Sequence, residues 1–313
     1  MKKKAIIVSF KSYFLTNNEK KILKQNPWGV ILFKRNIRSL NQLKKLIISI
    51  RETSKDKNLP IIIDEEGGSV SRLKNLIKFN LTQKSFGEIY KIDKVLAKNI
   101  YKNYVYGLCN ELKNIGININ TVPVLDVVRN YTHSIIGDRS FSDDPEIVKI
   151  LGKLCVKYYK KKKVGTIIKH IPGHGCSVSD SHLKLPKVKF SQEKLNRIDF
   201  YPFKSNTSTF AMTAHILYTK IDNKNVATFS NKIISQIIRK KLSFRGILIS
   251  DDISMKALKY DLIKNAKKAL LAGCNLVLYC AGKYQESCKL IEEVPYIDKF
   301  TSKKTSEFYK FLR

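Results

Sequence analysis

The 313-residue sequence has no run of apolar residues long enough to cross a membrane. A membrane-spanning helix needs about 20 such residues in succession. The first residues, Met1 to Lys4, resemble the basic start of a secretion signal, but Lys11 ends the apolar stretch that follows. That stretch is shorter than the ~7–15 residues that such a signal requires. We therefore expect a cytoplasmic protein without a membrane partner.

The sequence also has no Cys-X-X-Cys pair, although it contains six cysteines. Several of them lie among leucine, valine and tyrosine residues, where a free thiol packs like a small apolar side chain. This usage is typical of a reducing compartment and argues against a disulfide framework.

Acidic residues are scarce, since 26 Asp and Glu stand against 59 Lys and Arg, for a formal charge of +33. Such an excess is found in proteins that bind nucleic acids or anionic surfaces. Here the lysines are spread along the chain, mostly at polar positions of amphipathic segments, without a basic tail or an aromatic-basic repeat. We interpret the charge as a solvated surface and expect no nucleic-acid partner. Nucleic-acid binding stays an alternative function, which salt-dependent binding would test.

Short apolar runs recur along the chain and are rich in β-branched residues. Runs of this kind predict parallel strands that are covered on both faces. The predicted strands are residues 5–10, 29–33, 60–64, 117–124, 165–170, 210–217, 246–251 and 275–280.

Helical signals fill the gaps between these runs. Ser39, with Gln42 three residues later, predicts a capping box, and Gly116 is placed to end a long helix that begins near residue 95. Asp144 followed by Pro145 predicts another helix start. Eight strand–helix units favour a single-domain (β/α)8 TIM barrel over residues 1–313. A doubly wound open sheet is the alternative, although no Gly-X-Gly-X-X-Gly or P-loop motif follows any strand.

Polar residues gather at the carboxyl ends of the predicted strands. Any one of them could be a helix cap or a satisfied core group, but five strand ends with such residues are hard to explain by structure alone. In a barrel these ends converge on one mouth, where active sites form. The residues concerned are Asp64, Asp126, Lys169, His170, His215, Asp251 and Asp252.

The segment from Lys169 to His182 is the most informative part of the chain. Pro172, Gly173 and Gly175 prevent regular structure there, so we expect a loop that presents Asp180 and His182 side by side. A carboxylate beside an imidazole fixes its tautomer and raises its basicity. Such a pair is suited to move protons near neutral pH.

Two further motifs contribute carboxylates. In the segment 64–72, Asp64 at a strand end could accept hydrogen bonds from sugar hydroxyls, and Arg72 could return a side chain to the mouth. The alternative is a glycine turn with a weak surface ion pair. In the segment 249–255, Asp252 could cap the next helix, which leaves Asp251 as the better candidate for chemistry.

The segment 169–182 contains residue types that bind metal ions, but their spacing does not favour a metal site. His170, His174, Cys176, Asp180 and His182 are all of the kinds that bind zinc. Pro172-Gly173, however, prevents the helix that would align the first two histidines, and Lys169 would repel a cation. We expect neither a metal nor an organic cofactor.

Together these motifs resemble those of the glycoside hydrolase family 3 β-N-acetylhexosaminidases. The resemblance covers most of the chain, and Lys-His-X-Pro-Gly-His-Gly followed by Asp-Ser-His is highly specific to that group. The segments that carry it are residues 29–36, 64–72, 136–141, 169–182 and 250–255. Ser69 departs from the family pattern, which often has Arg or another long polar residue there, and this change could alter the packing of its loop.

The resemblance implies a role for each matching residue. It implies that Asp251 is the nucleophile, His182 the general acid/base and Asp180 its partner. The implied pocket for N-acetylglucosamine (GlcNAc) consists of Asp64, Arg72, Arg139, Lys169 and His170. The implied reaction is retaining hydrolysis of terminal β-linked GlcNAc by a monomer, with GlcNAc-anhydroMurNAc muropeptides of cell-wall recycling as the expected substrate. A β-N-acetylglucosaminide phosphorylase and another family 3 β-glycosidase stay as alternatives.

Overall fold

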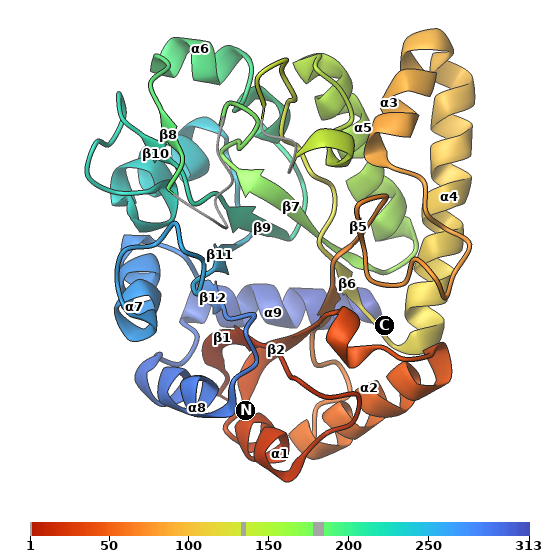
Figure 1. The fold of residues 1–313 in the computed structure, drawn as a ribbon, viewed down its shortest axis with the longest axis vertical. Helices are drawn as coiled ribbons and strands as arrows, with labels where there is room; N and C mark the ends of the chain where they lie inside the picture. Colours follow the sequence, from red (N-terminus) through yellow and green to blue (C-terminus); the bar gives the residue numbers. More distant parts are fainter. Residues whose placement is uncertain (1, 133–135, 178–184) are drawn as a thin grey trace.

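Eight parallel strands close into a barrel in the computed structural model, which describes residues 2–132, 136–177 and 185–313. The strand order around the barrel is β1-β12-β11-β9-β7-β6-β3-β2. Each strand pairs in parallel with its neighbours (Figure 1). The strands are β1 (Lys4–Val8), β2 (Pro27–Leu32), β3 (Ile61–Ile63), β6 (Ile119–Asn120), β7 (Gly165–Ile171), β9 (Phe210–Thr213), β11 (Ile247–Asp252) and β12 (Leu276–Leu278). The predicted (β/α)8 class is confirmed, and the open sheet is wrong.

Every predicted strand overlaps one barrel strand, but two of the barrel strands are much shorter than the apolar runs suggested. In the run 117–124, β6 ends at Asn120, and Pro123 has no N–H to donate to a neighbouring strand. The run 210–217 splits into β9 and a separate β10 (Leu217–Tyr218), which pairs with β8 (Lys187–Val188) outside the barrel. His215 was predicted to lie within the strand, and this is wrong because it follows the end of β9.

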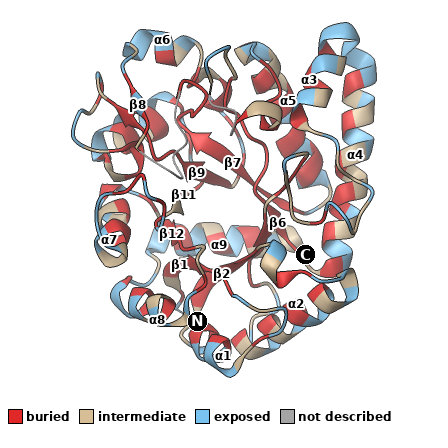
Figure 2. Cartoon of the chain, in the orientation of Figure 1, coloured by how far each residue is buried: buried red, intermediate tan, exposed pale blue. Residues whose placement is uncertain are grey.

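Helices surround the barrel with their exposed faces outward (Figure 2). They are α1 (Asn17–Lys24), α2 (Leu40–Ser54), α3 (Gln83–Ile92), α4 (Lys94–Ile115), α5 (Pro145–Lys161), α6 (Gln192–Arg197), the π-helical segment η5 (Ile233–Lys241), α7 (Leu262–Ala272), α8 (Tyr284–Glu293) and α9 (Lys299–Leu312). In the described part of the chain, none of them combines the length and apolar character that a bilayer crossing requires.

The helix boundaries follow the signals in the sequence. The Ser39 side chain accepts a hydrogen bond from the Gln42 amide, whereas the Gln42 side chain accepts one from the amide of Arg38 rather than of Ser39. The predicted capping box is therefore only half formed. Gly116 ends α4 with φ of +100°, a left-handed conformation that glycine adopts without strain. Asp144 caps α5, which has Pro145 at its first position.

The amino end of the barrel is closed by the last helix. Phe308 of α9 lies edge-on to Phe210 at 5.1 Å between ring centroids, inside the apolar layer that fills the barrel. The indole N–H of Trp28, which is buried in β2, donates to Thr305 Oγ1 at 2.8 Å. With this end sealed, a substrate must enter at the carboxyl ends of the strands, where barrel enzymes place their sites.

Replacing Phe308 with alanine is expected to lower the free energy of unfolding by about 3–5 kcal/mol, because the loss of a buried ring leaves a cavity. The matched control is Phe300→Ala on the same helix, where the ring is 40% exposed and the expected loss is below about 1 kcal/mol. Urea denaturation measures both losses. Equal losses would contradict the view that α9 anchors the barrel through its inner face.

Candidate active site

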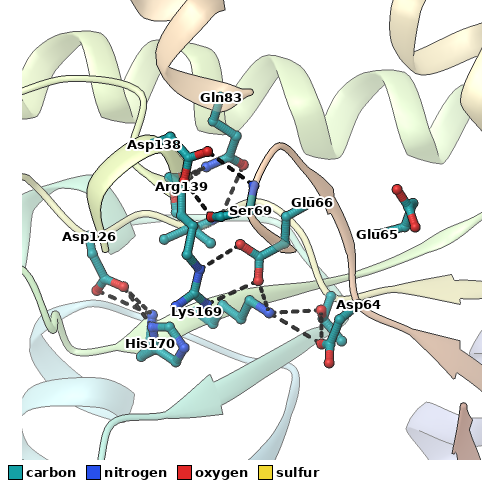
Figure 3. A network of polar contacts seen from close by, with 12 residues as sticks. Asp64, Glu65, Glu66, Ser69, Gln83, Asp126, Asp138, Arg139, Lys169 and His170 are labelled. Carbon is teal, nitrogen blue, oxygen red and sulfur yellow. Dashed lines mark hydrogen bonds and ion pairs between the residues drawn. The ribbon is translucent and has the colours of Figure 1, made fainter. Parts of the chain in front are cut away.

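A cavity of about 340 Å³ lies at the carboxyl ends of the barrel strands. Charged side chains from loops and strands far apart in the sequence line it, and several of them are drawn in Figure 3. Its polar lining is formed by Asp64, Glu66, Arg72, Arg139, Lys169, His170, Asp251 and Asp252. A larger cavity of about 560 Å³ lies beside α9 at the opposite end of the barrel, away from these residues.

Asp64, directly after β3, is held as an ionised carboxylate. Arg72 Nη2 donates to its Oδ2 at 2.9 Å, and Lys169 Nζ lies 3.4 Å from its Oδ1. Thr121 Oγ1 donates to the same Oδ1 at 2.5 Å. Burial alone would raise the pKa of Asp64, but the charges of Lys169 and Arg72 outweigh it and hold this pKa well below its usual value. The carboxylate therefore acts as a fixed acceptor at neutral pH.

Glu66 is the central acidic group of the cavity, and the sequence analysis did not single it out. Arg139 donates to it through two nitrogens, at 2.8 and 3.0 Å, and Lys169 Nζ lies 2.5 Å from its Oε1. Burial opposes its ionisation, yet Arg139 and Lys169 bring the pKa of Glu66 below its ordinary value. Glu66 thus orients two of the predicted sugar-binding cations. Arg139 and Lys169 need this counter-charge because they are buried, and their burial cannot be seen in the sequence.

The neighbouring Glu65 has a different role. Side chains alternate along β4 (Glu65–Gly67), so Glu65 points away from the network that contains Glu66 (Figure 3). Its carboxylate accepts hydrogen bonds from the amides of Arg72 and Leu73, each at 2.8 Å. Glu65 therefore fixes the hairpin of β4 and β5 (Val70–Ser71), which carries Arg72 back to the cavity.

His170 at the end of β7 is held by a buried carboxylate. Its Nδ1 lies 2.6 Å from Asp126 Oδ2, and Asp126 Oδ1 accepts from the His174 amide at 2.6 Å. Burial would raise the pKa of Asp126, but His170 lowers it overall. Asp126 therefore fixes the ring of His170, a pairing that the sequence analysis did not predict.

Two adjacent aspartates end β11, and their surroundings differ. The Asp252 carboxylate accepts from Ser254 Oγ at 2.7 Å and from the amides of Ser254 and Cys280 at 3.1 Å each. Burial raises the pKa of Asp252, and the nearby charge of Asp251 adds to this. Asp252 thus ties its loop to the end of β12 and does not cap α7, which is capped by Asp261. The alternative role that the sequence suggested for Asp252 is wrong.

His215 contacts the backbone at the end of the same strand, β11. Its Nε2 lies 3.0 Å from the carbonyl oxygen of Asp252, and its Nδ1 lies 2.8 Å from Thr228 Oγ1. The ring is buried, and burial lowers its pKa. His215 therefore positions the backbone of β11 next to Asp251 and does not line the cavity.

The structure brings together six of the eight residues that the sequence analysis predicted for the site. Asp251, Asp64, Arg72, Arg139, Lys169 and His170 all line the same cavity. The remaining two, Asp180 and His182, lie outside the described residues. Within the described part of the chain, no group of three His, Cys, Asp or Glu side chains is arranged to hold a metal ion.

Ser69, the residue that departs from the family pattern, makes contacts of its own. Its amide donates to Asp138 Oδ2 at 3.0 Å, and its hydroxyl donates to Oδ1 at 2.5 Å. These bonds join the β4–β5 hairpin to the short 3-10 turn Gly137–Arg139 (Figure 3). The loop that carries Arg139 is therefore packed directly on the hairpin that carries Glu66.

Paired charges line a cavity at the carboxyl end of a closed (β/α)8 barrel, beside the strand-end carboxylate of Asp251, which is where barrel enzymes have their active sites. The family model for the glycosyl hydrolase family 3 N-terminal domain matches residues 5–303. The chain therefore belongs to glycosyl hydrolase family 3, as its motifs predicted.

Curated relatives are similar over most of their length. A β-hexosaminidase from Shewanella frigidimarina is 36% identical over 261 residues, which are 80% of this chain and 74% of the relative. A β-hexosaminidase from Nitrosomonas eutropha is 34% identical over 257 residues, with 80% and 73% covered.

Solved structures agree with this relationship. NagZ from Neisseria gonorrhoeae in complex with N-trifluoroacetyl-D-glucosamine superposes with a TM-score of 0.88 at 28% identity, covering 100% of this chain and 91% of that one. A family 3 β-N-acetylglucosaminidase from Paenibacillus gives a TM-score of 0.85 at 26% identity, with 98% and 60% covered. The resemblance to the family 3 β-N-acetylhexosaminidases is confirmed.

The buried histidine next to this network predicts a pH dependence of stability. Burial, followed by the charge of His170, lowers the pKa of His174 from 6.5 to about 4. Below pH 6.5 the unfolded chain binds a proton at this residue that the folded protein does not, so stability falls as the pH drops toward 4. This shift corresponds to roughly 3 kcal/mol at most.

Urea denaturation at pH 6.5 and pH 4.5 measures this effect. His174→Asn is expected to lose less stability between the two pH values than the wild-type protein, by about 2 kcal/mol. The carboxylates titrate in both proteins, so their contribution to the loss of stability cancels when the variant is compared with the wild-type protein. The same loss in both proteins would contradict a buried, neutral His174.

Proposed function

We propose that this glycoside hydrolase is a retaining β-N-acetylglucosaminidase that removes terminal, non-reducing GlcNAc from β-linked glycosides. The observation that carries the proposal is the cavity in which Asp251 lies beside the paired Asp64, Glu66, Arg139 and Lys169. The β-hexosaminidase relatives and the NagZ complex with an N-acylated glucosamine support the choice of sugar.

Asp251 is the proposed nucleophile. Its strand, β11, presents it at the cavity, while three hydrogen bonds hold the neighbouring Asp252 in its loop. A carboxylate oxygen of Asp251 would form a bond to the anomeric carbon as the bond to the leaving oxygen breaks. This gives a covalent glycosyl-enzyme in which the anomeric configuration is inverted once.

His182, with Asp180 as its partner, is the proposed general acid/base. His182 would give its proton to the leaving oxygen in the first step. In the second step it would take a proton from water, whose oxygen displaces Asp251 and restores the original configuration. Support comes from the Asp-Ser-His motif and from its place in the sequence, shortly after His170, which lines the same cavity as Asp251.

Asp64, Arg72, Arg139, Lys169 and His170 are the proposed sugar-binding residues. Because their charges are largely paired within the cavity, they offer fixed donors and acceptors to a neutral ligand. Hydrogen bonds to ionised groups are about twice as strong as those between neutral groups. A rigid set of them suits hydroxyl and acetamido groups at defined positions.

The proposed biological substrates are GlcNAc-anhydroMurNAc muropeptides from cell-wall recycling, cleaved by a monomer in the cytoplasm. The similarity to NagZ supports this setting, and so do six cysteines that form no disulfide. We propose a single catalytic domain over residues 1–313, without metal or other cofactor and without a nucleic-acid or membrane partner.

Hydrolysis of an aryl β-N-acetylglucosaminide tests the sugar specificity. We expect release of free GlcNAc, with kcat/KM at least about a hundredfold above that for the matching glucoside, because the site would lose its contacts to the acetamido group. Phosphate in the assay distinguishes the phosphorylase alternative, which would yield sugar 1-phosphate instead of free sugar. Faster cleavage of the glucoside would overturn the proposal in favour of another family 3 glycosidase.

A pair of matched variants tests the nucleophile. Asp251→Asn is expected to lower kcat by about a thousandfold or more, because an amide cannot form the glycosyl ester. Asp252→Asn retains an acceptor for the amides of Ser254 and Cys280 and is expected to stay within about tenfold of the wild-type kcat. Mass spectrometry after reaction with a 5-fluoro GlcNAc inactivator should locate the sugar on the peptide that contains Asp251. Labelling of another carboxylate would refute the assignment.

A further inference from the structure

Phe33, the residue that follows β2, lines the active-site cavity but takes no part in the proposed reaction. It is the only phenylalanine, tyrosine or tryptophan among the described residues that line this cavity. Two guanidinium groups lie over its ring, with their central carbons 4.7 Å (Arg35) and 5.4 Å (Arg72) from the ring centroid. Only Arg72 also lines the cavity, so the ring joins a proposed sugar-binding residue to a residue outside the cavity.

Hydrogen bonds alone do not fix the orientation of Arg72. In the described part of the chain its guanidinium donates only to Asp64, through Nη2 at 2.9 Å, and its Nε is buried without a partner. Arg139, by contrast, donates two hydrogen bonds to Glu66. A planar guanidinium that makes a single hydrogen bond can rotate about it. The face of an aromatic ring within about 6 Å attracts the cation and so limits this rotation.

The ring of Phe33 has a fixed position at the end of β2. The Phe33 amide donates to Asn36 Oδ1 at 3.0 Å, and Asn36 is fully buried. Asn36 Nδ2 donates in turn to the carbonyl oxygen of Phe10 at 3.0 Å. The backbone that carries the ring is therefore tied to the segment that follows β1.

Arg35 contacts the same ring and is anchored more firmly than Arg72. Its Nε donates to the carbonyl oxygen of Phe10 at 2.8 Å, and its Nη2 donates to Ser9 Oγ at 2.8 Å and to the carbonyl oxygen of Cys280. Phe10 follows β1 and Cys280 follows β12, so Arg35 joins the ends of three adjacent strands. Arg35 thus gives the ring a second fixed contact outside the cavity.

We infer that Phe33 is a positioning residue of the sugar site: its ring, anchored by Arg35, holds the Arg72 guanidinium in the orientation in which it can bind Asp64 and a sugar hydroxyl together. The inference rests on the proposed hydrolysis of β-linked GlcNAc. Phe33 does not act on the bond that breaks. Because the contact is the same before and during the reaction, its loss weakens the binding of substrate and transition state alike, which raises KM and leaves kcat unchanged.

Kinetics with an aryl β-N-acetylglucosaminide test this role in the variant Phe33→Leu, which keeps an apolar side chain but lacks the ring. We expect KM to rise about tenfold while kcat stays within about threefold of the wild-type value. A purely structural role predicts a different result, because a partly unfolded enzyme has a lower apparent kcat and an unchanged KM. An unchanged KM would overturn the inference.

The variant Arg72→Met separates an action through Arg72 from a direct contact between the ring and the sugar. If the ring acts through the guanidinium, adding Phe33→Leu to Arg72→Met changes KM by less than about twofold. The dissociation constant of GlcNAc gives the same comparison if Arg72→Met lowers turnover below detection. Equal fold-changes in the presence and absence of Arg72 would overturn the inference.

Phe244 offers a matched control. The guanidinium of Arg239 lies over its ring at 5.5 Å, and neither residue lines the active-site cavity. Phe244→Leu therefore removes the same kind of contact from another part of the barrel. It is expected to lower stability and to leave KM within about twofold of the wild-type value. An equal rise of KM in both leucine variants would assign the effect to lost packing and overturn the role of Phe33.

Failure of the inference and failure of the proposed function are distinguishable. If the wild-type protein hydrolyses the aryl compound and Phe33→Leu has the same KM, the role of Phe33 alone is overturned. If the wild-type protein does not hydrolyse the compound, the proposed function is overturned and the role of Phe33 with it.

Discussion

The site depends on the contact between Lys169 and the two carboxylates of Asp64 and Glu66. It links the end of β7 to the segment after β3, two positions on opposite sides of β6 in the barrel. Removing one member of a buried charge pair leaves the other uncompensated, which costs several kcal/mol. The arrangement is therefore rigid, and its rigidity is what allows charged groups to present fixed hydrogen-bonding positions to a ligand without net charge.

The sequence predicted the barrel and most of the site because both follow from short-range patterns. Apolar runs fixed the eight strands, and carboxyl ends of parallel strands converge by geometry, so Asp64, Lys169 and Asp251 were placed together before any coordinates. Glu66 was missed because nothing in Asp-Glu-Glu distinguishes it from Glu65 until the hairpin alternates their directions. His215 was placed in a strand because its apolar neighbours conceal the break after Thr213.

The surface lysines show a second limit of the sequence. They are spread so evenly along the chain that no single one of them stands out. Only the folded chain shows that the carboxylates near Lys224 and Lys259 are occupied by loop and helix amides. A lysine can pair with a ligand only if the carboxylates near it are bound to other groups. The amino-acid composition does not show which groups those carboxylates bind.

The seam that closes the barrel joins its first strand to its last. β1 pairs with β12, and Phe308 near the end of the chain fills the space above Gly165. During synthesis on the ribosome, β1 can pair with β2 early, but it can pair with β12 only after residues 276–278 have been made. The apolar layer at the amino end of the barrel is completed later still, when α9 supplies Phe308. Long-range pairings of this kind fold slowly and leave strand edges exposed meanwhile. Until β12 has been made, one edge of β1 therefore has no partner in the barrel.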